Sequence, residues 1–239
     1  MNVLLSGQSN ALGQRAGGPP FSDCHAAVEV WNNFNPLGSY GYEWVRPREA
    51  RPPFQLSRAT NNLGVWFAHH AAQRLGSPVR LTVVATANRS IIDWLPGVGP
   101  MFDTIEAIFH AQGAASYDVM LWHQGEADRG CDSAWYREAL EWLVNELRDQ
   151  RILTRKAPAI LGGLPSPMDA CINHVLRETA QENASMRFVD AAGVPTEGSL
   201  EHFSGEGLAE LGRRYFEAFQ APCAATRNRP SARNGADRF

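Results

Sequence analysis

The chain has 239 residues, of which 44% are hydrophobic and 20% charged, and its formal net charge at pH 7 is −3. This length fits one α/β domain, because a chain of this size buries most of the surface that its unfolded form exposes. The slightly negative charge and the lack of a long apolar run argue against nucleic acid and membranes as partners.

Short runs rich in Val, Ile and Leu alternate along the chain with amphipathic stretches. The runs predict strands at residues 2–5, 27–31, 79–85, 117–122, 159–163 and 187–190. Apolar residues at helical spacing predict helices at residues 62–75, 132–150, 168–183 and 207–219. Most of the strands are nearly continuous apolar runs, which is typical of parallel strands covered by helices on both faces. The sequence therefore predicts an α/β fold around a parallel sheet.

The segment between Trp31 and Asn62 is dense in Pro, Gly, Asn, Arg and aromatic residues and shows no clear periodicity. A long irregular loop in a compact domain is more often functional than idle. Its aromatic side chains are suited equally to stacking on sugar rings and to core packing, and the sequence leaves both interpretations open. They are Trp31, Phe34, Tyr40, Tyr42 and Trp44.

The two ends of the chain differ in character from its middle. The N-terminus has no basic segment followed by a long apolar stretch, so we expect no signal peptide. The location is otherwise unknown, and the cytoplasm or a larger assembly such as a virion would fit. Residues 1–221 form the predicted domain, and residues 222–239 form an arginine-bearing tail that is either solvated or docks onto another protein.

Ser9 follows the first predicted strand directly, in the segment Ser-Gly-Gln-Ser-Asn at residues 6–10. Ligands of open parallel sheets bind at the carboxyl ends of the strands, so Ser9 is a candidate site residue. A turn that leads into a helix can also direct the backbone N–H of Ser9 towards an oxyanion. Alternatively, Ser9 and Asn10 form only a helix N-cap, which is the simpler interpretation of this segment alone.

Two further polar clusters follow later elements. The sequence Trp-His-Gln-Gly-Glu-Ala-Asp at residues 122–128 comes after an apolar strand. A buried strand that ends in His, Gln and Glu is costly unless these groups are hydrogen-bonded or face a wet cleft. Asp128 or Asp132 is expected to cap the next helix. His202 lies in the loop before the last helix, where a neutral imidazole could take a proton from a serine.

Together these clusters resemble the SGNH hydrolase superfamily, specifically its sialic-acid-specific acetylesterase and related carbohydrate acetylesterase branch. Residues 7–10 resemble the nucleophile block, residues 122–128 the His-Gln-Gly-Glu block, and residues 202–215 the terminal histidine block. Residues 87–94 stand where the family has a glycine pair followed by Ser-Ile and a Trp. Blocks that occur together in this order are more specific than any one block. The resemblance implies a three-layer α/β/α sandwich with a mostly parallel five-stranded sheet, as in flavodoxin-like folds.

The resemblance also implies a mechanism. Ser9 would attack an ester carbonyl, and His202 would take its proton and deliver it to the leaving alcohol. The oxyanion would be bound by the backbone N–H groups of Ser9 and Asn88 and by the side-chain amide of Gln124. No cofactor and no metal is expected, because the four cysteines and the histidines lack the spacing of a metal site.

Two departures from the family pattern qualify this assignment. Many members carry an aspartate three residues before the histidine, where this chain has Ser199. Glu201 is adjacent to His202 and poorly placed, and Glu197 could serve only if the loop folds back. The resemblance implies instead that Glu126 orients His202, because some relatives are thought to use the equivalent glutamate of the His-Gln-Gly-Glu block. If it does not, a weaker Ser-His dyad remains.

The second departure is Ala87-Asn88 in place of the glycine pair, which narrows the acyl site and favours acetyl over long acyl groups. The sequence thus predicts a serine esterase that removes acetyl groups from an O-acetylated sugar or polysaccharide. The alternative is a catalytically decayed carbohydrate-binding or structural module of a surface or phage-tail assembly, to which the tail would dock. A metal hydrolase is a remote third possibility.

Overall fold

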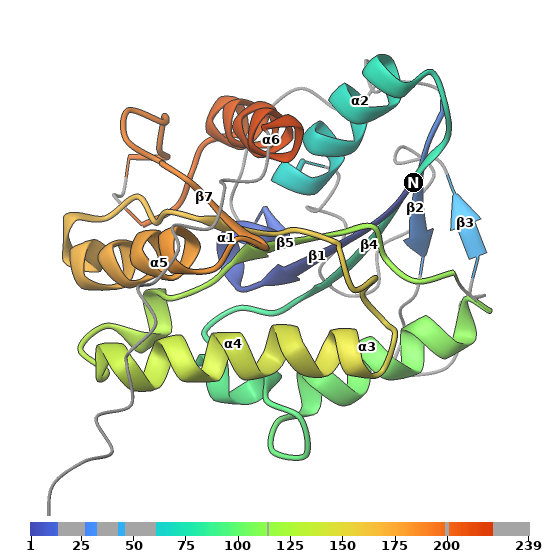
Figure 1. The fold of residues 1–239 in the computed structure, drawn as a ribbon. Coiled ribbons are helices and arrows are strands. Elements are labelled where there is room, and N and C mark those ends of the chain that lie inside the picture. The colour runs from blue at the N-terminus through green and yellow to red at the C-terminus, as the bar shows by residue number, and fades with distance from the viewer. Residues whose placement is uncertain (14–26, 33–42, 46–60, 114, 199–200, 222–239) are drawn as a thin grey trace, which may run out of the picture.

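A central β-sheet with helices on both faces makes up the protein (Figure 1). The computed structural model describes residues 1–13, 27–32, 43–45, 61–113, 115–198 and 201–221. The strands are β1 (Asn2–Gly7), β2 (Val28–Asn32), β3 (Glu43–Val45), β4 (Val79–Ala85), β5 (Val119–His123), β6 (Ala159–Gly162) and β7 (Met186–Val189). Their order across the sheet is β3-β2-β4-β1-β5-β6-β7, and only the β2–β3 pair is antiparallel.

The predicted parallel sheet is confirmed, but the expected number of five strands was wrong, since the sheet has seven. Each apolar run that predicted a strand forms one, with ends shifted by a few residues. The seventh strand, β3, comes from the segment without periodicity. It pairs with β2 at the edge of the sheet through backbone hydrogen bonds, which require no apolar run of their own.

Six α-helices accompany these strands in the described ranges. They are α1 (Ser9–Leu12), α2 (Leu63–Leu75), α3 (Pro100–Ala111), α4 (Ser133–Asp149), α5 (Ala170–Glu182) and α6 (Gly205–Gln220). Three single turns of 3-10 helix are η3 (Ile91–Trp94), η4 (Glu126–Asp128) and η5 (Pro167–Asp169). The four predicted helices correspond to α2, α4, α5 and α6. Helix α3 was not predicted, although a proline at its first position favours a helix start. None of the described helices is long and apolar enough to cross a membrane.

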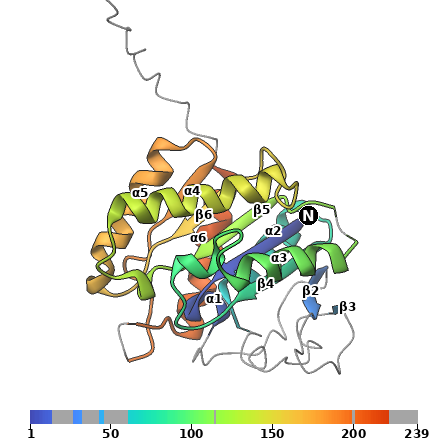
Figure 2. The same cartoon turned by 90° about the horizontal axis from the view of Figure 1, so that it is seen from below.

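The two helix layers cover opposite faces of the sheet. Helices α2 and α6 pack on one face, and α3, α4 and α5 cover the other (Figures 1 and 2). Each strand contributes side chains to the cores on both faces of the sheet, because successive side chains point in opposite directions. In β1, Val3 and Leu5 lie in the core under α2 and α6, and Leu4 lies in the core under α3 and α4. This is why the strand sequences are apolar throughout. Trp31 is buried in the second of these cores, which assigns this one loop aromatic to core packing.

The register of the three central strands brings the sequence blocks together at one edge of the sheet. Gly7, the last residue of β1, pairs with Ala85 at the end of β4 and with His123 at the end of β5. Gly7 has φ +146°, and a Cβ atom there would lie 2.0 Å from the carbonyl oxygen of His123. Only glycine therefore allows β1 to turn this close to β5. The turns that follow these strands carry Ser9, Asn88 and Gln124.

Candidate functional site

Ser9 is the first residue of the four-residue helix α1, immediately beyond the carboxyl end of β1. Gln8 occupies the N-cap position without a side-chain cap, so Ser9 and Asn10 are not the N-cap that the simpler interpretation proposed. The backbone N–H of Gln8 donates to the His123 carbonyl at 3.0 Å, which fixes the turn to the end of β5. Ser9 is 5% exposed. The N–H of a first helical residue has no intrahelical acceptor, so that of Ser9 is available to a ligand.

Asn88 lies in the turn that follows β4, next to the Ser9 turn. The N–H of Thr86 donates to the carbonyl of Gly7 at 3.1 Å and joins the two turns. Asn88 has φ +55°, in the left-handed region that favours glycine. Asparagine is among the few other residues that adopt this conformation readily. Asn88 can therefore adopt a backbone geometry that usually requires glycine, and its side chain is exposed.

Gln124 holds the Asn88 turn in place. Its side-chain amide donates to the carbonyl of Arg89 at 2.9 Å and to a carboxylate oxygen of Asp128 at 2.5 Å, and it lies 3.4 Å from Gln8 Oε1. The hydroxyl of Tyr136 contacts the amide oxygen at 3.0 Å and so fixes which end of the amide faces the turn. Because the amide already has protein acceptors, its use as an oxyanion donor remains a prediction.

Asp128 is the second residue that fixes this turn. Its carboxylate accepts hydrogen bonds from the Ser90 hydroxyl at 2.5 Å and from the Ile91 N–H at 2.9 Å, besides the amide of Gln124. It does not cap the following helix. That role belongs to Asp132, which accepts from the N–H of Trp135 at 2.8 Å. The sequence allowed either aspartate to be the cap, and the tertiary contacts give the two residues different roles.

His123 belongs to the core. It is fully buried, and its Nδ1 lies 3.0 Å from the hydroxyl of Tyr215, which itself donates to the carbonyl of Trp122. Burial lowers the pKa of His123 to about 3, so the ring is neutral at ordinary pH. The polar sequence that begins at the last residue of β5 therefore combines a core histidine with residues that lie at the edge of the sheet.

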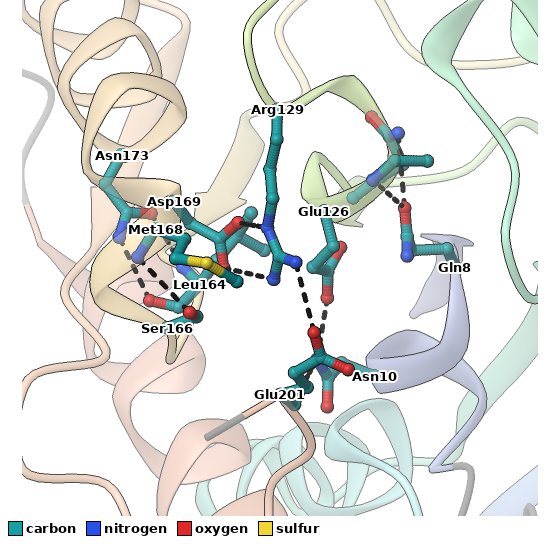
Figure 3. Close-up of polar contacts among 12 residues, drawn as sticks. Gln8, Asn10, Glu126, Arg129, Leu164, Ser166, Met168, Asp169, Asn173 and Glu201 are labelled. Atoms are coloured by element: carbon teal, nitrogen blue, oxygen red, sulfur yellow. Dashed lines mark hydrogen bonds and ion pairs between the residues drawn. The ribbon is translucent and has the colours of Figure 1, made fainter. Parts of the chain in front are cut away.

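Glu126 contacts the nucleophile turn through Asn10. The Nδ2 of Asn10 donates to Glu126 Oε1 at 2.7 Å, and the buried Oε2 has no hydrogen-bond partner among the described residues (Figure 3). Burial raises the pKa of this carboxyl to about 7, and the hydrogen bond from Asn10 opposes that rise. No hydrogen bond joins Glu126 to His202 within the described residues, so the orienting role of Glu126 remains a prediction.

The loop that carries His202 is held from two sides. The Nδ2 of Asn10 donates to the carbonyl of Glu201 at 2.9 Å, and the N–H of Phe203 donates to Asn10 Oδ1 at 3.1 Å. On the other side, the N–H of Glu197 donates to the carbonyl of His202 at 2.9 Å. The loop thus folds back, as a role for Glu197 would require. Ser199 lies outside the described residues.

Arg129 joins the same loop to the start of α5. Its guanidinium pairs with both carboxylate oxygens of Asp169, which is fully buried, and donates to Glu201 Oε1 at 3.1 Å (Figure 3). The two carboxylates raise the pKa of Arg129 above its already high value, so it is always charged. Glu201 therefore faces Arg129 and is engaged in holding the loop.

Sequence reasoning missed several of the residues that connect this site. Asn10 was part of the nucleophile block but was given no role there, and Asp128 was considered only as a helix cap. Arg129 and Asp169 lie 40 positions apart in sequence, and no local pattern indicates that they pair. Within the described part of the chain, no three His, Cys, Asp or Glu side chains are grouped in a way that could hold a metal ion.

A stability measurement can test the raised pKa of Glu126. Between pH 4.5 and about 7 the folded protein keeps a proton that the unfolded chain has lost, so stability falls as the pH rises through this window. Glu126→Gln removes this titration and can still accept from Asn10. At each pH, the free energy of unfolding of the variant is compared with that of wild type. We expect this difference to be up to about 3 kcal/mol more favourable to the variant at pH 8 than at pH 4.

Urea unfolding of both proteins at the two pH values measures this difference. Glu138→Gln, at an exposed position of α4, is the control and should show no such gain. If Glu126→Gln differs from wild type by the same free energy of unfolding at both pH values, the raised pKa of Glu126 is contradicted.

A parallel sheet between two helix layers, with Ser9, Asn88, Gln124 and the His202 loop at one edge, is an SGNH-like α/β arrangement. The sequence of the chain then defines its family. It matches the model of the family described as carbohydrate esterase, sialic acid-specific acetylesterase, over residues 2–221. The protein belongs to this family, and the predicted resemblance is confirmed.

Solved structures confirm the fold. A protein from Arabidopsis thaliana is 18% identical with a TM-score of 0.74, and the match covers 93% of this chain and 99% of that one. NanS is 16% identical with a TM-score of 0.67, over 91% of this chain and 95% of that one. A carbohydrate acetylesterase from Xanthomonas citri is 15% identical with a TM-score of 0.68, over 91% of this chain and 55% of that one. Comparison with curated proteins gave no match.

Proposed function

We propose that the protein is a serine esterase that removes acetyl groups from O-acetylated carbohydrate, with Ser9 as nucleophile and His202 as its base. One observation carries the proposal. Asn10, the residue after Ser9, hydrogen-bonds both residues that flank His202, at 2.9 Å and 3.1 Å. The nucleophile turn and the histidine loop are therefore tied together at the edge of the sheet where ligands of such folds bind.

The reaction proceeds by two acyl transfers. The hydroxyl of Ser9 attacks the ester carbonyl as His202 takes its proton, and His202 then protonates the leaving sugar hydroxyl. Water attacks the acetyl-enzyme with His202 again as base, which releases acetate and restores Ser9. The backbone N–H groups of Ser9 and Asn88 stabilise the oxyanion, and the side-chain amide of Gln124 joins them once one of its two hydrogens leaves the Arg89 carbonyl or the Asp128 carboxylate. The buried carboxyl group of Glu126 lies beside these residues and accepts a hydrogen bond from Asn10.

The family and the named relatives support the substrate class. The family description names carbohydrate esterases, and the relative from Xanthomonas citri is described as a carbohydrate acetylesterase. Hydrolysis requires water only, and every group in the proposed mechanism belongs to the chain itself.

Acetate release and covalent labelling test the proposal together. The purified protein should release acetate from O-acetylated monosaccharides and xylan, and a phosphonate ester should inactivate it and add its mass to the peptide that contains Ser9. A folded protein that releases no acetate from any of these substrates and takes no label would contradict the proposal.

The geometry at Asn88 predicts the preferred acyl length. We expect its side chain, at a position where the family has glycine, to narrow the space beside the Ser9 turn, so p-nitrophenyl acetate should be cleaved faster than p-nitrophenyl octanoate. Asn88→Gly keeps the left-handed backbone and removes the side chain. The ratio of octanoate to acetate turnover should therefore rise in this variant. Faster cleavage of octanoate by the wild-type protein would refute the small-acyl preference.

A further inference from the structure

We propose that Asn10 is a positioning residue, which holds the backbone on both sides of His202 and the carboxylate of Glu126 in fixed relation to Ser9. This role rests on the proposed function, because it assumes that Ser9 and His202 act together. Asn10 is 1% exposed and comes directly after Ser9 in α1. It does not touch the reacting atoms in the proposed mechanism.

The side chain of Asn10 acts on the histidine loop as a peptide group would. Its Oδ1 accepts from the N–H of Phe203, and its Nδ2 donates to the carbonyl of Glu201. These two backbone groups lie immediately before and after His202, so the amide fixes the peptide planes from which the imidazole projects. Phe203 is 1% exposed in the core under α2 and α6, which gives the loop a rigid support.

The second hydrogen of the same amide reaches Glu126. Asn10 Nδ2 donates to Glu126 Oε1 at 2.7 Å, so one buried side chain contacts both the histidine loop and the carboxylate. Asn10 thus links Glu126 to the backbone on both sides of His202, although no hydrogen bond joins Glu126 to His202 within the described residues. Among the described residues, the charged groups that act on the pKa of Glu126 are Arg129 and Asp169, which pair with each other, and Arg129 also binds Glu201.

An amide is the functional group that this position requires. Asn10 uses two donor hydrogens and one acceptor, all towards groups that are fixed in the fold. An aspartate would keep the acceptor for Phe203 but would present oxygens to Glu126 and to the Glu201 carbonyl. Two carboxylates in contact share one proton at lower pH, and the shared proton restores one donor.

Loss of the Asn10 side chain is expected to displace His202 only slightly relative to Ser9, but even a small displacement lowers the turnover rate strongly. A displacement of about 1 Å between reacting groups can cost about 100-fold in turnover. Ser9 and Asn10 lie in the same turn of helix α1. The amide of Asn10 therefore fixes the position of the histidine loop relative to Ser9. We expect the effect in kcat rather than in KM, because the substrate is bound by other groups.

Steady-state kinetics of Asn10→Ala and Asn10→Asp on p-nitrophenyl acetate test the role. In Asn10→Ala, kcat should fall about 10- to 100-fold with KM within about threefold of wild type. For Asn10→Asp, the ratio of its kcat to that of wild type should rise as the pH is lowered from 8 to 5.5. Amide exchange of Phe203, measured by NMR, should be faster in both variants.

Asn173→Ala is the matched control. Asn173 also holds a backbone segment by two hydrogen bonds, to the N–H and the carbonyl of Leu164 at 2.7 Å and 3.0 Å. Its loss should leave kcat within about threefold of wild type and the pH profile unchanged. A folded Asn10→Ala protein with wild-type kcat would overturn the positioning role and leave the proposed esterase standing. A wild-type protein without Ser9-dependent turnover would remove the proposed function and this role with it.

Discussion

Replacing Ser9 by alanine is expected to lower kcat for acetate release by about four to six orders of magnitude, because no other group can form the acyl-enzyme. The fold should not change, since the Ser9 hydroxyl makes no hydrogen bond to another described residue. Acetate release and p-nitrophenyl acetate turnover measure the loss, and the melting temperature checks the fold. Equal turnover by wild type and variant would contradict the esterase proposal and favour the catalytically decayed module.

His202→Ala provides the companion measurement. If Ser9 and His202 act as one unit, each single substitution costs nearly as much as both together, so the double variant should be no more than about tenfold slower than either. Losses that multiply in the double variant would show that the two residues act independently. Small residual turnover from oxyanion stabilisation alone is consistent with the proposed mechanism.

The largest loss of stability is expected for Asp128→Ala. The carboxylate accepts from the Ser90 hydroxyl, the Ile91 N–H and the Gln124 amide, and Asp128 is 5% exposed. Its removal leaves buried donors without an acceptor, and each such donor costs about 1–3 kcal/mol. We expect the free energy of unfolding to fall by about 3 kcal/mol or more. Turnover should fall as well, because the turn that carries Asn88 loses its support.

Asp132→Ala is the matched control, since this aspartate lies four residues later and caps α4 from an exposed position. Loss of an N-cap costs about 1 kcal/mol, and turnover should be unaffected. Urea unfolding of both variants gives the comparison. Equal destabilisation by the two substitutions would contradict the different roles that their contacts indicate.

The fold could be predicted largely from local patterns. Nearly continuous apolar runs predicted the parallel strands, and apolar residues at helical spacing predicted four of the helices. Both patterns arise from which side chains of one strand or helix face the core, and this depends only on residues close together in the sequence. Strand β3 and the number of strands could not be obtained in this way, because an edge strand pairs through its backbone.

The site could be predicted in part. The blocks at Ser9, Asn88 and Gln124 follow the strands that end together, so parallel topology places them at one edge. Which polar side chains contact one another could not be predicted. Asp128 and Asp132 are the same residue type in one short segment, yet only Asp132 caps the helix.

By itself, the sequence determined the α/β class, the edge of the sheet at which the polar blocks meet, and the family through its ordered blocks. These features depend on residue types and spacing along the chain. Only the tertiary structure decided that Asn10 joins Glu126 to the backbone around His202, and that Arg129 joins Asp169 to Glu201. Such contacts span from 40 to 193 positions in sequence, and they exist only because the packed layers bring these segments within hydrogen-bonding distance.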